Sequence, residues 1–182
     1  MTQFERCKAC GLIMKSSKRY TICPACGVPR SAFEEYRETM SGRRKLILDL
    51  HLHPITVHFP QAISTILLLL LAADMAFSID LSATIKVLAF ILPLSAMAAF
   101  ISGLIDAHAR FKKLTTPFIV EKSVLGALFL VLSSLIAAMC HFFGLESPWR
   151  YVMLAASAGC VASQAALGTI GIQLMFAKLP GK

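Results

Sequence analysis

Apolar positions are unevenly distributed along the 182-residue chain. The first fifty residues mix charged, polar and apolar side chains, whereas most of the chain from Pro54 onward lies in long apolar runs. We predict helices over the ranges 54–77, 84–105, 117–143 and 149–176. Each is at or near the ~20 residues that a helix needs to cross the hydrocarbon core of a bilayer. The short connections between them predict a compact antiparallel four-helix transmembrane bundle.

The composition indicates an integral membrane protein of the all-α class. Hydrophobic residues make up 57% of the chain and charged residues only 15%, and the mean hydropathy is +0.70, far above that of an ordinary soluble domain. The formal net charge is +8, but the basic residues gather beside the apolar runs instead of forming a separate basic domain. We therefore expect no nucleic-acid partner.

The distribution of lysine and arginine predicts the orientation of the helices. Ten of these residues precede the first predicted helix, three lie in the second connection and two follow the fourth helix, while the first connection has none and Arg150 alone lies beside the third. By the positive-inside rule both termini are cytoplasmic, in a multi-pass protein of the cell inner membrane. The basic stretch 42–45 also favours contact with anionic membrane lipid. We divide the chain into a module (1–33), a basic linker (34–50) and a transmembrane domain (51–182).

Four of the six cysteines form two Cys-x-x-Cys pairs, Cys7 with Cys10 and Cys23 with Cys26. Each pair aims two thiolates from one turn at a common centre, and a glycine directly after each pair supplies the backbone freedom that the turn needs. Two such turns close a four-sulfur cage around a metal, which would supply most of the folding free energy of so short a module. Such a cage suits zinc and iron alike, and spacing leaves the metal open.

The strings Cys7-Lys-Ala-Cys10-Gly and Cys23-Pro-Ala-Cys26-Gly-Val-Pro, followed by Phe33, resemble the short rubredoxin-like domain found at the end of rubrerythrins. The resemblance covers about residues 4 to 33. In that family the cage holds one redox-active iron, so the resemblance implies iron here. The loop 12–22 departs from the family, since it lacks the usual aromatic residue after the first Cys-Gly and is more basic. A structural zinc site of the zinc-ribbon kind is the alternative.

Three of the five histidines, His51, His53 and His58, fall within eight residues at the predicted start of the first helix. His58 and His108 come from helices of opposite direction and should lie at the same end of the bundle. Two histidines so placed could ligate a b-type haem, as in a cytochrome b, and we take this pair as the candidate haem ligands, with His53 and His51 as substitutes. Asp106 or Glu121 would orient the rings. The alternative is that these histidines meet lipid headgroups.

A few polar residues elsewhere lead to narrower expectations. Asp74 and Asp80 border the other end of the bundle and are expected to be solvated, and Gln164, in a run of small residues, is expected to bond between helices. Lone Cys140 and Cys160 are expected to be small buried hydrophobes. One or two charged helical turns are predicted around Glu34, Glu35, Arg37 and Glu38.

The sequence around His53 carries a second resemblance. The string His53-Pro-Ile-Thr-Val-His58-Phe-Pro60, together with Gly103-Leu-Ile-Asp106, is similar to a family of small bacterial and archaeal four-helix membrane proteins without an established activity. The resemblance covers roughly residues 51 to 176 and implies the fold. Members of that family often have a histidine near the start of the third helix, where this chain has Glu121 and Lys122.

These features favour a membrane-bound electron-transfer protein that passes single electrons between the iron site and a haem. Its partner would be a redox protein on the cytoplasmic side, and assembly into a homo-oligomer stays open. Whether the chain is an enzyme is undecided, with an electron carrier or an oxidoreductase subunit favoured over a stand-alone enzyme. The alternative is a non-catalytic assembly or interaction subunit whose N-terminal module is stabilised by zinc. A quinone-reducing enzyme is a third class, for which the sequence locates no pocket.

The charge distribution makes a testable prediction of topology. A reporter fused after Lys182 should be cytoplasmic, and one inserted near Glu146 should lie on the outer side, because basic connections stay in the cytoplasm. Protease accessibility or reporter activity in intact cells measures both. Both reporters on one side of the membrane would contradict the predicted helix count.

Overall fold

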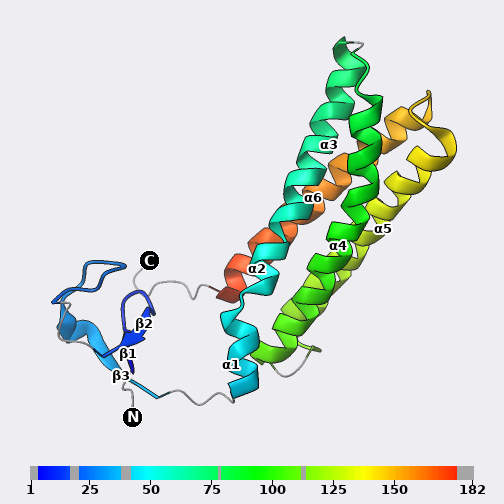
Figure 1. Ribbon diagram of the computed structural model, residues 1–182. Coiled ribbons are helices and arrows are strands. Elements are labelled where there is room, and N and C mark those ends of the chain that lie inside the picture. Colours follow the sequence, from blue (N-terminus) through cyan, green and yellow to red (C-terminus); the bar gives the residue numbers. More distant parts are fainter. Residues whose placement is uncertain (1–3, 17–20, 38–41, 78, 112–113, 176–182) are drawn as a thin grey trace. The chain divides into compact units, whose positions relative to one another are not determined.

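A computed structural model describes residues 4–16, 21–37, 42–77, 79–111 and 114–175 (Figure 1). The side chains of Arg43 and of the residues after Ile172 are outside this description. The described residues form two compact units, one up to Gly42 and one from Arg43 onward.

The N-terminal unit contains a three-stranded antiparallel sheet in the order β2-β1-β3. Its strands are β1 (Phe4–Cys7), β2 (Ile13–Lys15) and β3 (Phe33–Tyr36), and the short 3-10 helix η1 (Arg30–Ala32) leads into β3. Among the described residues of this unit only Cys7 and Cys23 are buried. The sheet therefore has no apolar core of its own to stabilise it.

The prediction of helical turns around Glu34 and Glu35 is wrong, because both residues lie in β3. Cross-strand pairing explains this outcome. Glu34 lies opposite Arg6 of β1, an opposite-charge pair of the kind that stabilises antiparallel strands. Glu38 lies outside the described residues.

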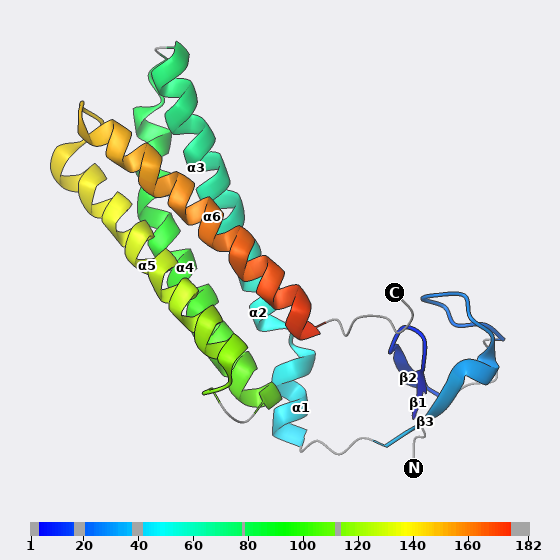
Figure 2. The ribbon, with the colours of Figure 1, turned by 180° about the vertical axis from the view of Figure 1, so that it is seen from behind.

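The second unit is helical, and four of its helices are long and apolar enough to span a membrane. Its elements are α1 (Gly42–Asp49), α2 (Leu52–Thr56), α3 (His58–Phe77), α4 (Ser82–Phe111), α5 (Pro117–Phe143) and α6 (Trp149–Met175). The long helices run side by side, and α3 packs against α4 and α6 while α5 packs against α4 and α6 (Figures 1 and 2). The predicted fold class, a four-helix bundle preceded by a small cysteine-bearing module, is confirmed.

The first predicted helix is interrupted near its start. Helix α2 ends at Thr56 and α3 begins at His58. Pro60 is the physical reason, because its ring lacks the N–H that would bond to the Thr56 carbonyl and would clash with that carbonyl in a continuous helix. Pro54 and Pro60 therefore each occupy the first turn of a separate helix, where proline is tolerated.

Helix α4 runs six residues beyond the predicted end at 105. Its C-terminal carbonyls are satisfied by a residue far away in sequence, because Arg44 of α1 donates to the carbonyls of Ala109 and Arg110. Within the last turns, Arg110 also pairs with Asp106 at 2.9 Å, four positions earlier on the same helix. These contacts extend a helix whose apolar pattern has already stopped.

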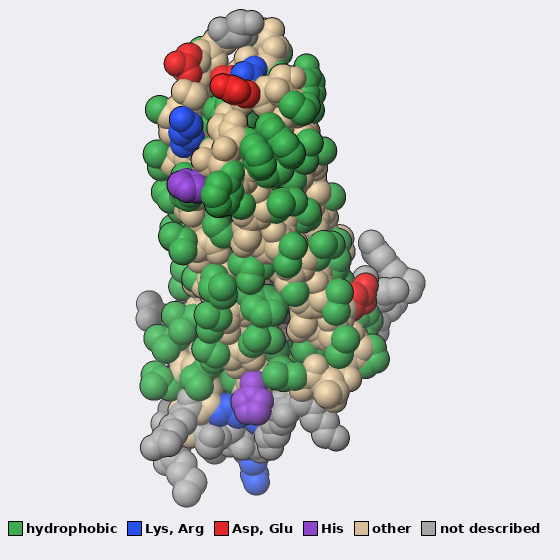
Figure 3. Space-filling model, turned by 90° about the vertical axis from the view of Figure 1, so that its right-hand side faces the viewer, with side chains coloured by type: hydrophobic (Ala, Val, Ile, Leu, Met, Phe, Trp, Pro, Cys, Tyr) green, Lys and Arg blue, Asp and Glu red, His purple; other side chains and the backbone are tan. Residues whose placement is uncertain are grey.

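The apolar core of the bundle lies toward the α3–α4 and α5–α6 connections. It is formed by Leu67, Leu71, Ile85, Ala89, Leu92, Ala96, Phe129, Ile136, Met139, Cys140, Met153, Ala156 and Cys160. Both lone cysteines are thus buried hydrophobes, as predicted. On the outside, large apolar side chains are exposed along the helices, and Figure 3 shows them covering the middle of one face, with charged groups at its upper and lower ends. Such a surface fits a lipid environment.

The prediction that Asp74 is solvated is wrong. Its carboxylate is 7% exposed, accepts the Leu81 N–H at 3.2 Å and lies 3.4 Å from the Arg150 guanidinium. Arg150 also donates to the Leu145 carbonyl. Asp74 therefore joins the end of α3 to the start of α4 and to α6, which a sequence cannot reveal because the partner lies 76 positions away.

Replacing Asp74 by alanine should destabilise the bundle. The change removes the acceptor for a backbone N–H and leaves Arg150 without its carboxylate partner, so we expect the free energy of unfolding to fall by about 2 kcal/mol. Thermal unfolding in detergent measures the effect, and Glu146→Gln, an exposed acid at the same end, is the control. An unchanged unfolding temperature in Asp74→Ala would contradict the assigned role.

Candidate metal centre

The four paired cysteines converge in space. The Sγ atoms of Cys7, Cys10, Cys23 and Cys26 all lie within 4.8 Å of one another. Cys7 Sγ is 3.8 Å from Cys26 Sγ, and Cys10 Sγ is 3.7 Å from Cys23 Sγ. A tetrahedral metal with bonds of about 2.3 Å to sulfur has edges of about 3.8 Å between its ligands. The arrangement therefore fits one tetrahedral four-thiolate ion, and no disulfide links these cysteines.

The two halves of the cage repeat the same backbone turn. The N–H of Cys7 donates to the Leu12 carbonyl and that of Cys23 to the Val28 carbonyl, both at 2.8 Å. The glycines that follow each pair, Gly11 and Gly27, have φ values of +76° and +75°. Only glycine adopts this left-handed conformation without strain, so the two glycines explain why each pair of thiols can face one point.

The electrostatics of the cage favour a bound cation. Burial opposes ionisation of the Cys23 thiol, but the backbone N–H groups of Cys26 and Ala25 outweigh it and lower its pKa to about 7. The Val28 N–H acts in the same direction on Cys26, but desolvation and the neighbouring thiols outweigh it and raise the pKa of Cys26 to about 12. Four thiolates this close repel one another, and a divalent or trivalent metal ion removes that repulsion.

The cage has a covered side and an open side. Cys7 and Cys23 are 0% and 1% exposed, whereas Cys10 and Cys26 are both exposed. The ion would thus be shielded by the sheet and accessible through the sulfurs of Cys10 and Cys26. Access through sulfur suits electron exchange, while the fully occupied ligand set leaves no position for a substrate.

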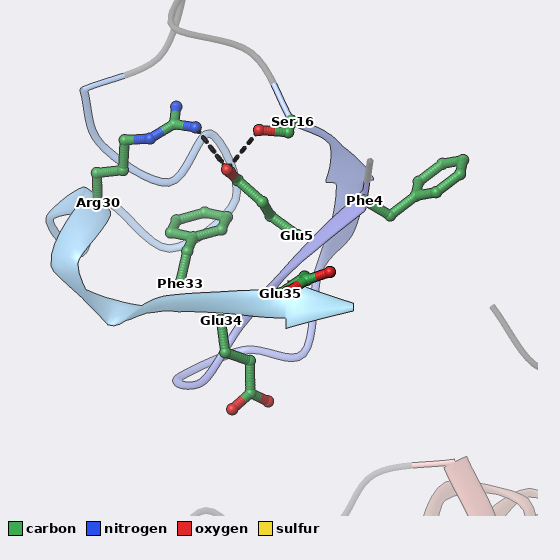
Figure 4. A pocket seen from close by; sticks show the side chains of 7 residues that line it. All are labelled: Phe4, Glu5, Ser16, Arg30, Phe33, Glu34 and Glu35. Atoms are coloured by element: carbon green, nitrogen blue, oxygen red, sulfur yellow. Dashed lines mark hydrogen bonds and ion pairs between the residues drawn. The ribbon is translucent and has the colours of Figure 1, made fainter. Parts of the chain in front are cut away.

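Next to the sheet the N-terminal unit has a polar pocket of about 390 Å³ (Figure 4). Arg30 and Ser16 converge on the Glu5 carboxylate, with Arg30 Nη2 at 2.8 Å from both Glu5 oxygens and Ser16 Oγ at 2.6 Å from one. This ion pair ties η1 to β1. Because the carboxylate is already satisfied, the pocket serves the fold of the module and does not add to the metal centre.

The histidine pair expected to bind haem lies at one end of the bundle. His58 begins α3 and His108 lies in the last turn of α4, and both side chains are exposed. Asp106, expected to orient a histidine, pairs with Arg110 instead, and Glu121 is exposed. The haem site stays a prediction, with its two histidines at the same end of the bundle. His51 is also exposed, and His141 packs against Phe142 with ring centroids 4.9 Å apart.

His53 is the histidine that the bundle holds most firmly. Its ring fills a notch at Gly103, where an added Cβ would lie 2.9 Å from the ring. Its Nδ1 donates to the Ala99 carbonyl at 3.2 Å, and the adjacent hydroxyls of Thr56 and Ser102 are 2.7 Å apart. The two strings singled out in the sequence, around His53 and around Gly103, thus meet in space. The sequence contained both residues, but nothing in it showed that they touch.

Removing one ligand should empty the cage. We expect Cys10→Ser and Cys26→Ser each to lose the bound metal, because a hydroxyl is a poor substitute for thiolate and the described residues of the module form no apolar core that would hold the site together. Elemental analysis of the purified protein measures the ratio of metal to protein, expected to be one in the wild type. Cys160→Ala, which removes a cysteine of the helical core, should keep that ratio. Full metal content in both serine variants would rule out the cage.

Comparison with protein-family models assigns the N-terminal module. Residues 6–34 match the model described as the rubrerythrin, rubredoxin-like domain. No match was found among curated proteins or among solved structures. The matched range contains all four cysteines of the cage, so the chain carries a rubredoxin-like metal-binding domain ahead of four helices long enough to span a membrane.

Proposed function

We propose that this protein is a membrane-bound carrier of single electrons whose rubredoxin-like cage holds one iron. The observation that carries the proposal is the cage itself, with four cysteine sulfurs at tetrahedral spacing in a domain that matches the rubrerythrin, rubredoxin-like model. When bound, an iron ion in such a cage supplies a reversible ferric–ferrous couple.

The geometry favours a carrier over an enzyme acting on a substrate. All four coordination positions are taken by cysteine, whereas a catalytic metal keeps a position open for water or substrate. The exposed sulfurs of Cys10 and Cys26 give a partner protein a short route to the ion. We place this partner on the cytoplasmic side, together with both termini, from the distribution of basic residues.

Zinc is the second candidate, and one observation favours it. The N-terminal unit lacks an apolar core among its described residues, which is typical of domains that a structural zinc ion folds. With zinc the module would be a rigid, redox-inert surface, and the protein would act as an assembly or interaction subunit. The two candidates use the same four sulfurs and differ in the ion alone.

A haem b in the bundle is the finer part of the proposal, with His58 and His108 as its axial ligands. Both offer imidazole nitrogens from stiff helices at the same end of the bundle. Because both side chains are exposed, a haem would reach them from the surface of the bundle and not from its core. If it binds, it supplies a second one-electron couple within the membrane domain.

A redox titration followed by visible absorption tests the carrier proposal. We expect the absorption of the native protein to bleach reversibly on reduction, with the slope of a one-electron couple, because iron in a cysteine cage changes charge without changing ligands. Any haem adds a separate spectrum that His58→Ala and His108→Ala abolish and His141→Ala keeps. A protein without redox-dependent absorption would contradict the carrier and leave the zinc reading.

A further inference from the structure

The interior of the bundle changes character along its length. The apolar core ends at Leu67, Ala96, Phe129 and Cys160. Beyond these residues, toward the end that carries α2, polar and small residues share the buried and half-buried positions with apolar ones such as Ile119 and Ile170. The polar and small residues are His53, Ser64, Ser102, Gly103, Asp106, Lys122, Gln164, Gly168 and Gly171. We call this part of the bundle the α2 end. Polar groups at such depth are costly in a membrane protein and mark functional sites.

Gln164 has a hydrogen-bond donor with nothing to bind. Its Oε1 accepts the Ser64 hydroxyl at 3.0 Å, which confirms the predicted bond between helices α3 and α6. The residue is only 8% exposed, and its Nε2 has no hydrogen-bond partner within the described part of the chain. A buried donor without an acceptor costs about 1–3 kcal/mol, so an acceptor from outside the protein would be bound favourably there.

Lys122 is a second donor without a fixed partner. It is half-buried on α5, and its Nζ reaches toward α6, 3.7 Å from where a Cβ on Gly171 would lie. The nearby Asp106 carboxylate is engaged by Arg110 at 2.9 Å, and the described residues give Lys122 no ion pair or hydrogen bond. Among the described residues the ammonium thus has charged neighbours, Asp106 and Arg110, but no hydrogen-bond acceptor.

The glycines of α6 leave room beside these donors. A Cβ built on Gly168, one turn along α6 from Gln164, would meet nothing within 4 Å. Gln164 and Gly171 are seven residues apart, which is about 10 Å along the helix axis. One six-membered ring with a hydrogen bond at each end spans a distance of that order. By contrast, the notch at Gly103 is already filled by the ring of His53.

We propose that the α2 end binds the head group of an isoprenoid quinone between Gln164 and Lys122. A quinone has a carbonyl oxygen at each end of one apolar ring, and carbonyl oxygens accept hydrogen bonds without donating them. That matches a site whose unfilled groups are both donors. The positive charge of Lys122 favours a carbonyl that gains negative charge on reduction. The choice of a quinone over other carbonyl lipids rests on the proposed function, because an electron carrier in a membrane needs a lipid-soluble redox partner.

The buried amide of Gln164 favours a quinone over the phosphate of an anionic lipid as the ligand of this site. A phosphate at the membrane surface would be held by Lys122 and the basic residues around it. It would not need a neutral amide buried between α3 and α6. An apolar ring with polar ends satisfies both the amide inside and the ammonium nearer the surface.

The test uses the full-length protein, with its metal, purified in detergent and freed of endogenous quinone. Titration with decylubiquinone, followed by calorimetry, should show saturable binding at one site per chain. Gln164→Leu and Lys122→Met should each raise the Kd about tenfold, because each removes one hydrogen bond to the ligand. Decylubiquinone should also raise the unfolding temperature of the wild type and have a smaller effect on either variant.

Two control variants separate a ligand contact from a structural role. Lys86→Met, which removes an exposed lysine near the other end of α4, should bind as the wild type does. Ser64→Ala removes the bond to Gln164 Oε1 but keeps the Nε2 donor, so its Kd should change less than twofold. Unfolding temperatures without ligand show whether each variant is folded.

Absence of saturable binding to the wild type would overturn the inference, as expected if water alone satisfies Gln164. Wild-type affinity for decylubiquinone in Gln164→Leu and Lys122→Met would also overturn it. So would a loss of affinity in Lys122→Met that is seen only in vesicles containing phosphatidylglycerol. The proposed function is judged separately. A protein that holds iron but binds no quinone refutes this site alone, whereas a zinc protein that binds quinone refutes the iron carrier alone.

Discussion

The main physical constraint on the N-terminal unit is that its backbone brings four cysteine sulfurs within 4.8 Å of one another. As thiolates, these four groups repel one another. The sheet buries only two described residues, and both are ligands, so no apolar core holds the sulfurs together. A metal ion is the physical agent that turns the repulsion into attraction. The paired turns, the two left-handed glycines and the exposed sulfurs of Cys10 and Cys26 are consequences of building a cage around such an ion in about thirty residues.

The helical unit meets a different constraint, because its outer surface is apolar and the described polar contacts between its helices lie toward its ends and in the interior of the α2 end. Asp74 and Arg150 tie helices together at one end, and Arg44 closes the last turns of α4 at the other. Between them an apolar core of small and aliphatic residues holds the helices. At the α2 end the Ser64–Gln164 bond and the ring of His53 against Gly103 add contacts between helices, and Gln164 Nε2 remains a buried donor without an acceptor among the described residues.

Sequence reasoning predicted most of the fold and less of the site. Helix α5 has the predicted limits, and the cysteine pairs came together as expected, because both depend on local spacing and long apolar runs. The break at Val57 was not predicted, because Pro60 disrupts the helical hydrogen bond to the Thr56 carbonyl and so ends the helix several residues before the proline itself. The ion pair of Asp74 and the notch filled by His53 depend on how each helix is rotated about its axis, which an apolar stretch of uniform character does not specify. The same rotation leaves His58 and His108 exposed, whereas His53 meets Gly103.

The identity of the bound metal decides between an iron electron carrier and a zinc-containing assembly subunit. Protein purified from its native host, without added metal, can be analysed for iron and zinc and examined by visible absorption. We expect about one iron per chain and the visible charge-transfer absorption of ferric iron bound by four thiolates. Stoichiometric zinc in a colourless module would contradict this expectation.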